Sequence, residues 1–397
     1  MRILFHLLPA LVDIITGLFM FISAKRMADS GANSFLIAAT MAVWALFYAG
    51  TAFGLGYILT KRNAVKILLA GQTILFISLL GLVLMPEVTA QYFWLPGTGI
   101  GTASFYTSFQ VVVKLFGKEE YALESIARNT AVYTFSWSFG LASGPMLTAF
   151  VWGLFSTGTG WRYCYIITMG MVIFTMACLV LMNRFVKQRL VELGEEGEAA
   201  PLPEIPPEQA KLPDLIIASW GIGILSGCVI AMMRTYIPDY CTKVLQMDTF
   251  KQGVVLALIS YMQAFTGLAC WKARRWPYRP WVFCTAAMLA CLAMGIFFFS
   301  SGWGAYLIGA CLLGIFYGIC YFMFTFHALI NPVKTARYVA GNETIVGLTS
   351  TCAPVLGGVL AMQCGDARVP FLFCGGLIFA ALLFFGCRTW KFRKLPE

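Results

Sequence analysis

Twelve long apolar stretches follow one another along this chain, and each is long enough to cross a lipid bilayer as a helix. A transmembrane helix needs about 20 apolar residues. Lipid offers the backbone no hydrogen-bond partners, so these runs favour helices. Transmembrane strands would need about ten residues each with strict alternation, which the runs lack. The stretches occupy roughly residues 3–24, 35–59, 67–86, 92–115, 128–152, 163–183, 214–233, 250–271, 281–300, 304–330, 339–362 and 369–387.

The composition agrees with a chain that lies mostly in a bilayer. Hydrophobic residues make up 59% of the 397 residues and charged residues only 12%, against about 25% charged in soluble domains. We therefore expect an all-α membrane protein with 12 transmembrane helices. The first stretch is not interpreted as a signal peptide, because its apolar run is too long, Asp13 interrupts it, and no small-residue cleavage site follows.

One polar segment divides the stretches into six and six. Residues 184–212 carry a cluster of prolines and glutamates that cannot bury apolar area, so we expect a solvated, partly disordered linker. The expected organisation is a first bundle over 1–183, a cytoplasmic linker over 184–212, a second bundle over 213–391 and a cytoplasmic tail over 392–397.

Lysine and arginine set the expected orientation, because they are more frequent on the cytoplasmic side of a membrane. With the N-terminus in the cytoplasm, 21 of the 28 Lys and Arg residues fall on that side. Both termini are therefore expected in the cytoplasm, with the chain in the cell's inner (plasma) membrane. This basic rim explains the net charge of +10, and no nucleic-acid-binding motif is present, so no nucleic-acid partner is expected.

The 13 cysteines do not resemble a disulfide framework, since eleven lie in or at the ends of the apolar stretches. There they serve as small packing residues. Cys241 and Cys364 fall in expected outer loops, and a bridge between them is left open. No paired C-x-x-C and only two histidines are present, so neither a metal site nor a cofactor is expected. A phosphate-binding loop of the G-x-x-x-x-G-K-[ST] type is also missing, which argues against ATP as the energy source.

The two halves of the chain share local sequence. RNTAVYTFSWSFGLASGP, from Arg128, aligns with RYVAGNETIVGLTSTCAP, from Arg337, and brings Pro145 opposite Pro354. The fifth apolar stretch thus matches the eleventh.

A second pair of segments repeats at nearly the same offset. GYILTK, from Gly56, matches GLACWK, from Gly267, so the second stretch matches the eighth. We interpret this as an internal duplication of a six-helix unit.

The fifth stretch combines Gly140 and Gly144 with Pro145, which a soluble helix rarely does. Small residues four apart let two helices approach closely in lipid. Proline removes a helix hydrogen bond and bends the helix, and neighbouring helices can satisfy the freed carbonyl. A moving gate needs both properties, and tight static packing is the alternative interpretation.

These residues resemble the major facilitator superfamily, and within it bacterial members. The glycine–proline signature of the fifth helix is Gly140, Gly144 and Pro145, with Pro354, Gly357 and Gly358 in the eleventh. The loop after the second helix keeps Gly56, Lys61 and Lys66 of the family pattern but has Thr60 at its aspartate position. The resemblance implies two pseudo-symmetric six-helix bundles, transport by alternating access, no enzymatic activity, and a monomer.

Ionisable residues inside a membrane span are costly, so they are candidates for function. Asp13 lies in mid-span and could couple proton movement to solute movement, or form a structural hydrogen bond. Glu343 is a second candidate, with a helix-start carboxylate favoured by the helix dipole as the alternative. His327 is a third proton-coupling candidate, although a lone histidine is more often simply hydrogen-bonded.

Polar-tipped aromatic and amide residues suit a solute cavity, because one end meets an apolar wall and the other hydrogen-bonds. For each of them, packing in the apolar interior is the alternative. The cavity candidates are Tyr106, Gln110, Trp137, Gln263, Tyr317, Tyr321 and Asn342. The gating and cytoplasmic-loop candidates are Gly56, Lys61, Arg128, Gly140, Gly144, Pro145, Arg337, Pro354, Gly357 and Gly358.

The leading hypothesis is a secondary active transporter that moves a small organic solute, with protons acting on Asp13 as the energy source. A facilitative uniporter and a solute sensor with a transporter fold are the alternatives. A membrane-embedded enzyme would need a cluster of His, Asp or Glu at the interface, which the sequence lacks. The sparse charge in the spans favours neutral or amphipathic solutes over highly charged ones.

Overall fold

The computed structural model describes residues 2–114, 123–155, 159–192, 214–247, 249–272, 276–331, 334–366 and 368–389. In these residues the chain is helical, with twelve long helices and no strand, as expected for an all-α membrane protein. The helices are α1 Arg2–Asp29, α2 Ser34–Ile58, α3 Ala64–Leu84, α4 Gln91–Lys114, α5 Leu123–Leu154, α6 Gly160–Glu192, α8 Ile216–Lys243, α9 Thr249–Ala269, α10 Pro280–Phe299, α11 Trp303–Leu329, α12 Thr335–Gln363 and α13 Val369–Thr389. Three short 3₁₀ helices join them, η1 Val88–Ala90, η2 Cys270–Lys272 and η3 Trp276–Tyr278.

Ten of these helices are long and apolar enough to cross a membrane on their own, and α4 and α5 are the two that are not. Both carry buried threonines and serines. Several of these hydroxyls bond to a carbonyl one turn back, as Thr102 does to Thr98 (2.9 Å) and Thr148 to Gly144 (3.0 Å). Helices α4 and α5 therefore turn polar faces toward protein rather than lipid.

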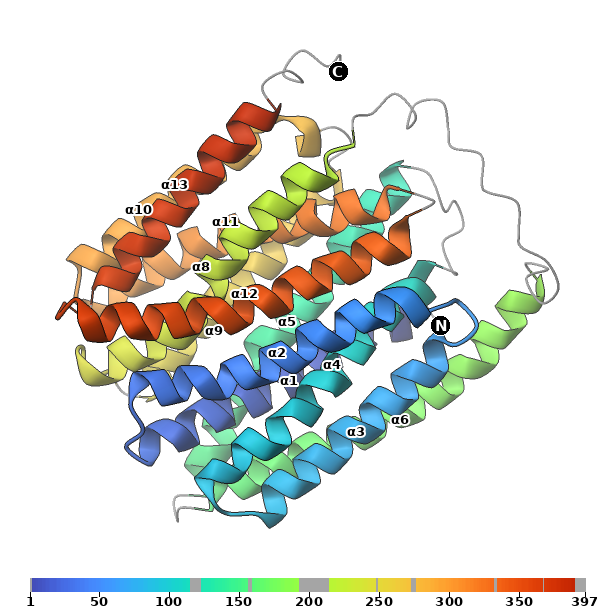
Figure 1. The fold of residues 1–397 in the computed structure, drawn as a ribbon, viewed down its shortest axis with the longest axis horizontal. Coiled ribbons are helices and arrows are strands. Elements are labelled where there is room, and N and C mark those ends of the chain that lie inside the picture. Colours follow the sequence, from blue (N-terminus) through green and yellow to red (C-terminus); the bar gives the residue numbers. More distant parts are fainter. Residues whose placement is uncertain are drawn as a thin grey trace.

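Two apolar cores organise the helices. One is built from buried residues between Leu8 and Leu190, and the other from residues between Leu215 and Phe385, with three residues of α5. We call α1–α6 the first half and α8–α13 the second half. In Figure 1 the blue to green helices of the first half lie on one side and the yellow to red helices of the second half on the other.

The halves meet along two helix pairs, α2 with α12 and α5 with α9. Small residues allow the close approach: Gly347 of α12 lies against the backbone of Ala49, and Gly267 of α9 lies against the side chain of Thr134. The sequence repeat matches α2 with α9 and α5 with α12. Each contact therefore pairs the second helix of one half with the fifth helix of the other half.

Glycines of α5 pack this helix against α1 within the first half. A Cβ atom at Gly144 would lie 2.7 Å from the Cα of Gly17, and one at Gly140 would collide with the carbonyl of Ala10. In the second half, Gly357 of α12 packs in a similar way on Met232 of α8. The small residues singled out in the sequence thus bring helices of the same half together.

Helices α6 and α8 extend furthest beyond the apolar stretches. Helix α6 continues to Glu192, so the first nine residues of the expected linker are helical. Residues 193–213, and the tail at 392–397, lie outside the described residues. Helix α8 continues to Lys243 and includes Arg234 and Cys241, which the sequence had placed in an outer loop.

The cysteines are unpaired. Cys241 is buried in α8, whereas Cys364 is exposed after the end of α12, and both are free thiols. The bridge that the sequence left open is therefore not formed in this structure.

Candidate functional site

A central cavity of about 560 Å³ lies between the two halves. Residues of α1, α2, α4, α5, α8, α9, α11 and α12 line it. Its volume is in the range of pockets that hold drug-sized ligands, roughly 300–1,000 Å³.

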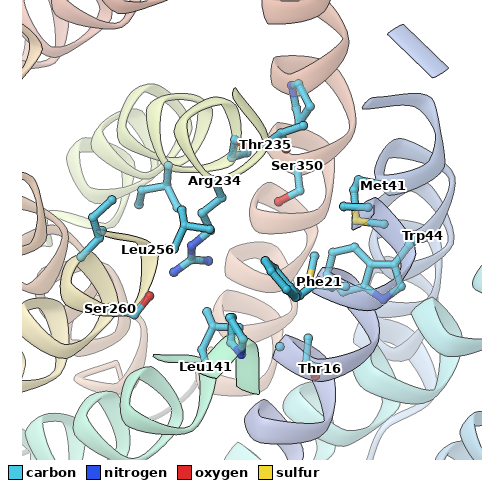
Figure 2. A pocket seen from close by; sticks show the side chains of 18 of the residues that line it. Thr16, Phe21, Met41, Trp44, Leu141, Arg234, Thr235, Leu256, Ser260 and Ser350 are labelled. Carbon is cyan, nitrogen blue, oxygen red and sulfur yellow. Dashed lines mark hydrogen bonds between the residues drawn. The ribbon is translucent and has the colours of Figure 1, made fainter. Parts of the chain in front are cut away.

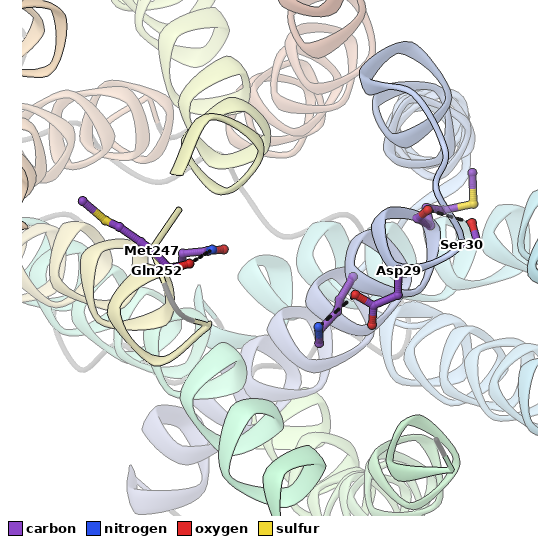
Figure 3. Close-up of polar contacts among 6 residues, drawn as sticks. Asp29, Ser30, Met247 and Gln252 are labelled. Atoms are coloured by element: carbon purple, nitrogen blue, oxygen red, sulfur yellow. Dashed lines mark hydrogen bonds and ion pairs between the residues drawn. The ribbon is translucent and has the colours of Figure 1, made fainter. Parts of the chain in front are cut away.

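The cavity reaches one end of the helix bundle. Its lining includes Asp29 and Ala32, where α1 gives way to α2, and Lys243 and Met247 at the end of α8. Figure 3 views this mouth, with Asp29 and Ser30 on one side and Met247 and Gln252 on the other. Among the described residues, the lining contains none from the last two turns of α2 or the first two turns of α5. The cavity is therefore open toward the α1–α2 connection.

Apolar and polar side chains alternate around the wall. Figure 2 shows Phe21, Trp44 and Leu256 beside hydroxyl groups, with the guanidinium of Arg234 projecting into the space between Leu256 and Phe21. The hydroxyl groups belong to Thr16, Thr235, Ser260 and Ser350. Such a wall suits an organic solute with an apolar body and a few polar atoms.

Asp13 of α1 lines the cavity in the middle of the bundle, with only 4% of its surface exposed. Its Oδ2 atom has no hydrogen-bond partner of good geometry among the described residues. Tyr106, Arg234 and Glu343 lie close enough to interact with its carboxyl group. Asp13 therefore places a buried carboxyl oxygen with unused hydrogen-bonding capacity at the cavity wall.

Glu343 of α12 is a second carboxyl group in the middle of the cavity, while Asp29 and Asp239 line its mouth. Its Oε2 accepts a hydrogen bond from the hydroxyl of Tyr48 of α2. Its Oε1 accepts one from Nε2 of Gln110 of α4 at 2.7 Å. Glu343 lies two turns inside α12, so it is not a carboxylate at a helix start, which was the alternative interpretation.

Aromatic side chains from both halves face one another across the site. Tyr106 of α4 and Trp137 of α5 line the cavity, as does Tyr321 of α11. The rings of Trp137 and Tyr321 meet edge to face, with centroids 4.8 Å apart. This pair therefore forms a direct contact between the two halves at the cavity wall.

Two amide side chains fix the cavity wall. Asn342 lines it, accepts a hydrogen bond from Nε1 of Trp220 at 2.8 Å, and donates one to the carbonyl of Phe324 at 2.9 Å. Gln263 of α9 lies one layer behind and donates to Ser138 of α5 at 2.8 Å. Gln263 therefore bridges the halves and lies outside the cavity lining.

Three other candidates lie away from the cavity lining. Gln110 stands behind Glu343, and Tyr317 is fully buried in the core of the second half. His327 packs against Tyr278 and Phe326, with ring centroids 5.3 and 5.4 Å away. A proton-coupling role for His327 gains no support from this placement.

The gating candidates fall into three groups. Pro145 and Pro354 line the cavity, at matching positions of α5 and α12. The glycines lie at helix contacts: Gly140 and Gly144 on α1, Gly357 on α8, Gly56 beside Ala340 of α12, and Gly358 buried between α2, α8 and α12. The cations lie at helix ends: Lys61 follows α2, and Arg128 and Arg337 are exposed near the starts of α5 and α12.

Sequence reasoning missed Arg234, as well as Trp44, Tyr48 and Tyr133, all of which line the cavity. Arg234 directly follows the apolar run of the seventh stretch, which is why it was assigned to a loop. The signal that could have placed it in the helix is the next segment, TYIPDY, whose tyrosines and isoleucine continue the membrane-compatible pattern.

Twelve helices in two repeated halves around a central amphipathic cavity define a multi-pass membrane transporter. The chain belongs to the Major Facilitator Superfamily, since the model of that family matches residues 6–331. Members of this family are transporters of small-molecule solutes and not enzymes. No curated protein sequence matches the chain significantly.

Two solved structures illustrate the shared fold. The human organic anion transporter MFSD10 (TETRAN) superposes with a TM-score of 0.66 at 12% identity, covering 96% of this chain and 97% of that one. The proton:xylose symporter XylE, bound to 6-bromo-6-deoxy-D-glucose, gives a TM-score of 0.69 at 12% identity, covering 98% of this chain and 95% of that one. At this identity the likeness extends to the fold.

Proposed function

We propose that the protein is a secondary active transporter that moves a small organic solute by alternating access and couples it to protons through Asp13. The observation that carries this proposal is the position of Asp13, a buried carboxyl group in the cavity between two repeated halves. An ionised carboxylate in the membrane interior is costly. A proton that enters from the open side would remove this cost and travel with the solute.

The open end of the cavity suggests which state this structure represents. With both termini in the cytoplasm of a cell with an inner membrane, the α1–α2 connection lies outside. The structure then corresponds to an outward-open state. In this proposal the protein works as a monomer in the bilayer, with a solute and protons as its partners and without a cofactor or nucleic acid.

The experiment uses purified protein in proteoliposomes that contain a pH-sensitive dye. Sugars, organic acids, amino-acid derivatives and cationic drugs are added one at a time. We expect one solute class to drive proton influx, and Asp13→Asn to abolish that flux while solute binding remains. Glu87→Gln is the matched control, because Glu87 is an exposed carboxylate before η1 and outside the cavity lining.

The outcomes separate the alternatives. Proton flux that survives in Asp13→Asn removes Asp13 from the coupling mechanism. Solute uptake without proton flux in the wild-type protein indicates a facilitative uniporter. Solute binding without uptake indicates a sensor with a transporter fold.

A further inference from the structure

Arg234 of α8 is a cation inside the cavity without an acidic partner in contact. The residue is half-buried, and no carboxylate of the described residues lies within 4.0 Å of its guanidinium. Its hydrogen-bond contact there is Nη2 to Oε1 of Gln263 at 3.4 Å, which is long. A guanidinium offers five N–H donors in a planar fork, so most of this fork faces the cavity.

Asp13 and Glu343, the two acids in the middle of the cavity, do not neutralise Arg234 directly. Both carboxylate oxygens of Glu343 already accept hydrogen bonds, from Tyr48 and from Gln110. Asp13 interacts with Arg234 only through the electric field, without a salt bridge. A cation that is partly removed from water gains most from an anion that completes its hydrogen bonds.

The other cations of the cavity are already paired. Lys25 forms a salt bridge with Asp29 at 3.1 Å, and Lys243 forms one with Asp239 at 2.7 Å, both at the mouth. Arg234 is thus the one basic side chain of the described lining that has no carboxylate in contact. A second negative charge on a solute would therefore find no further cation in the described lining that lacks a carboxylate in contact.

Much of the wall near Arg234 is apolar or aromatic. Figure 2 places Phe21, Leu256 and Leu141 around the guanidinium, with Trp44 further along the wall. Aromatic rings and aliphatic side chains of this kind accept a flat apolar body. The guanidinium of Arg234 and this apolar wall therefore suit two parts of one solute, an anionic group and an apolar body.

We infer that the solute is an organic monoanion, with a carboxylate bound by Arg234 and an aromatic or apolar body against the wall formed by Phe21, Trp44, Leu141 and Leu256. This inference rests on the proposed transport function and names the substrate class of the same cavity. Arg234 supplies two parallel N–H groups to the two carboxylate oxygens, the geometry that a guanidinium fork matches.

Equilibrium binding to the purified full-length protein in detergent tests the inference, with intrinsic tryptophan fluorescence as the readout. The probes share one body: 2-naphthoate, its neutral amide 2-naphthamide, and naphthalene-2,6-dicarboxylate. We expect the wild-type protein to bind 2-naphthoate at least about ten-fold more tightly than either other probe, which corresponds to about 1.4 kcal/mol.

Variants assign the preference to Arg234. Arg234→Gln should lose the preference for 2-naphthoate over 2-naphthamide, and Arg234→Lys should keep part of it, because lysine retains the charge but not the fork. Arg162→Gln is the control, since Arg162 is exposed and outside the cavity lining. Gel filtration and thermal unfolding establish that each variant is folded.

Three results would overturn the inference: equal binding of the amide and the carboxylate, no measurable binding of the carboxylate, or a carboxylate preference that persists in Arg234→Gln. Failure of the proposed function has a different signature. Binding of 2-naphthoate that depends on Arg234, without uptake into proteoliposomes, would retain the substrate class and reject transport. Proton flux driven only by neutral solutes would retain transport and reject the monoanion.

Discussion

The hydroxyl of Tyr48 donates a hydrogen bond to Oε2 of Glu343, and these two residues belong to opposite halves of the protein. Gln110 adds a second hydrogen bond from the first half to the same carboxylate, at 2.7 Å. Any motion that separates both α2 and α4 from α12 at this level must break both. These two hydrogen bonds to Glu343 therefore hold the halves together on the closed side of the cavity. We call them the clasp.

Removing this clasp should cost measurable stability. A double-mutant cycle of Tyr48→Phe and Glu343→Gln should give a coupling energy of about 0.6 kcal/mol, and at most about 1.7 kcal/mol, the range found for polar contacts between membrane helices. Thermal or denaturant unfolding in detergent measures it. A coupling energy of zero would mean that the contact has no energetic weight.

The clasp also predicts a shift in conformation. Because the Tyr48→Phe variant lacks one of the two hydrogen bonds, α12 should open more readily from α2. Hydrogen–deuterium exchange near Asn342 should then rise, while exchange in α10, which lies away from this contact, stays as in the wild type. Unchanged exchange in α12 would argue that the clasp does not limit this motion.

Close packing of α5 on α1 predicts a strong effect of a single methyl group. Gly144→Ala places a Cβ atom 2.7 Å from the Cα of Gly17, and backbone atoms cannot yield as a flexible side chain does. Overpacking of this kind costs about 1–3 kcal/mol. Gly153→Ala on the same helix is the matched control, because a Cβ atom there has nothing within 4 Å. Similar unfolding temperatures for the two variants would contradict the close contact.

Arg26 and Arg162 both lie against the ring of Trp161, and we expect them to contribute unequally to stability. Its guanidinium lies 3.7 Å from the centroid of Trp161 and donates to the carbonyl of Pro86 at 2.8 Å. Arg162 lies 5.1 Å from the same ring and is exposed. Arg26→Gln should therefore destabilise the protein by about 2 kcal/mol, and Arg162→Gln by much less. Chemical unfolding compares the free energies of unfolding of the two variants. Equal losses of stability would contradict the larger contribution expected of the Arg26 contacts.

The charges at the mouth predict how fast a monoanion enters. Asp29→Asn with Asp239→Asn removes the two carboxylates that form salt bridges with Lys25 and Lys243, and makes the mouth more positive. The on-rate of 2-naphthoate, measured by stopped-flow fluorescence, should rise at low salt by up to on the order of ten-fold. The gain should disappear at about 1 M salt, where the screening length is about 3 Å. A gain that is insensitive to salt would point to altered structure instead of electrostatic steering.

The sequence predicted the helices well because hydropathy is a local property of each segment. The repeat also predicted which helices are equivalent, and the structure places these equivalents at the two contacts between the halves. Site residues depend on neighbours far along the chain, which hydropathy does not contain. Tyr317 and Tyr321 lie one turn apart on α11, yet Tyr317 packs in a core and Tyr321 lines the cavity.

Arg234 and Glu343 show the two ways in which the site escaped prediction. An apolar window ends at a charge, so Arg234 was taken as the start of a loop although α8 continues to Lys243. Glu343 was identified, but its partners on α2 and α4 could not be, because 233 residues or more separate them in sequence. Only the packing of α12 against the first half brings them together.

The modest hydropathy of α4 and α5 has a consequence for how the protein is made. A segment leaving the ribosome enters the bilayer alone only if its own side chains favour lipid over water, and these two helices are the least suited to do so. Helix α4 can shelter against α2 and α3, which are synthesised before it. Helix α5 finds α1 already in place, but its second neighbour, α9, emerges only after the interhalf segment has been translated. The polar face of α5 is therefore incompletely covered while only the first half has been made. Synthesis of the second half then supplies α9, which covers it.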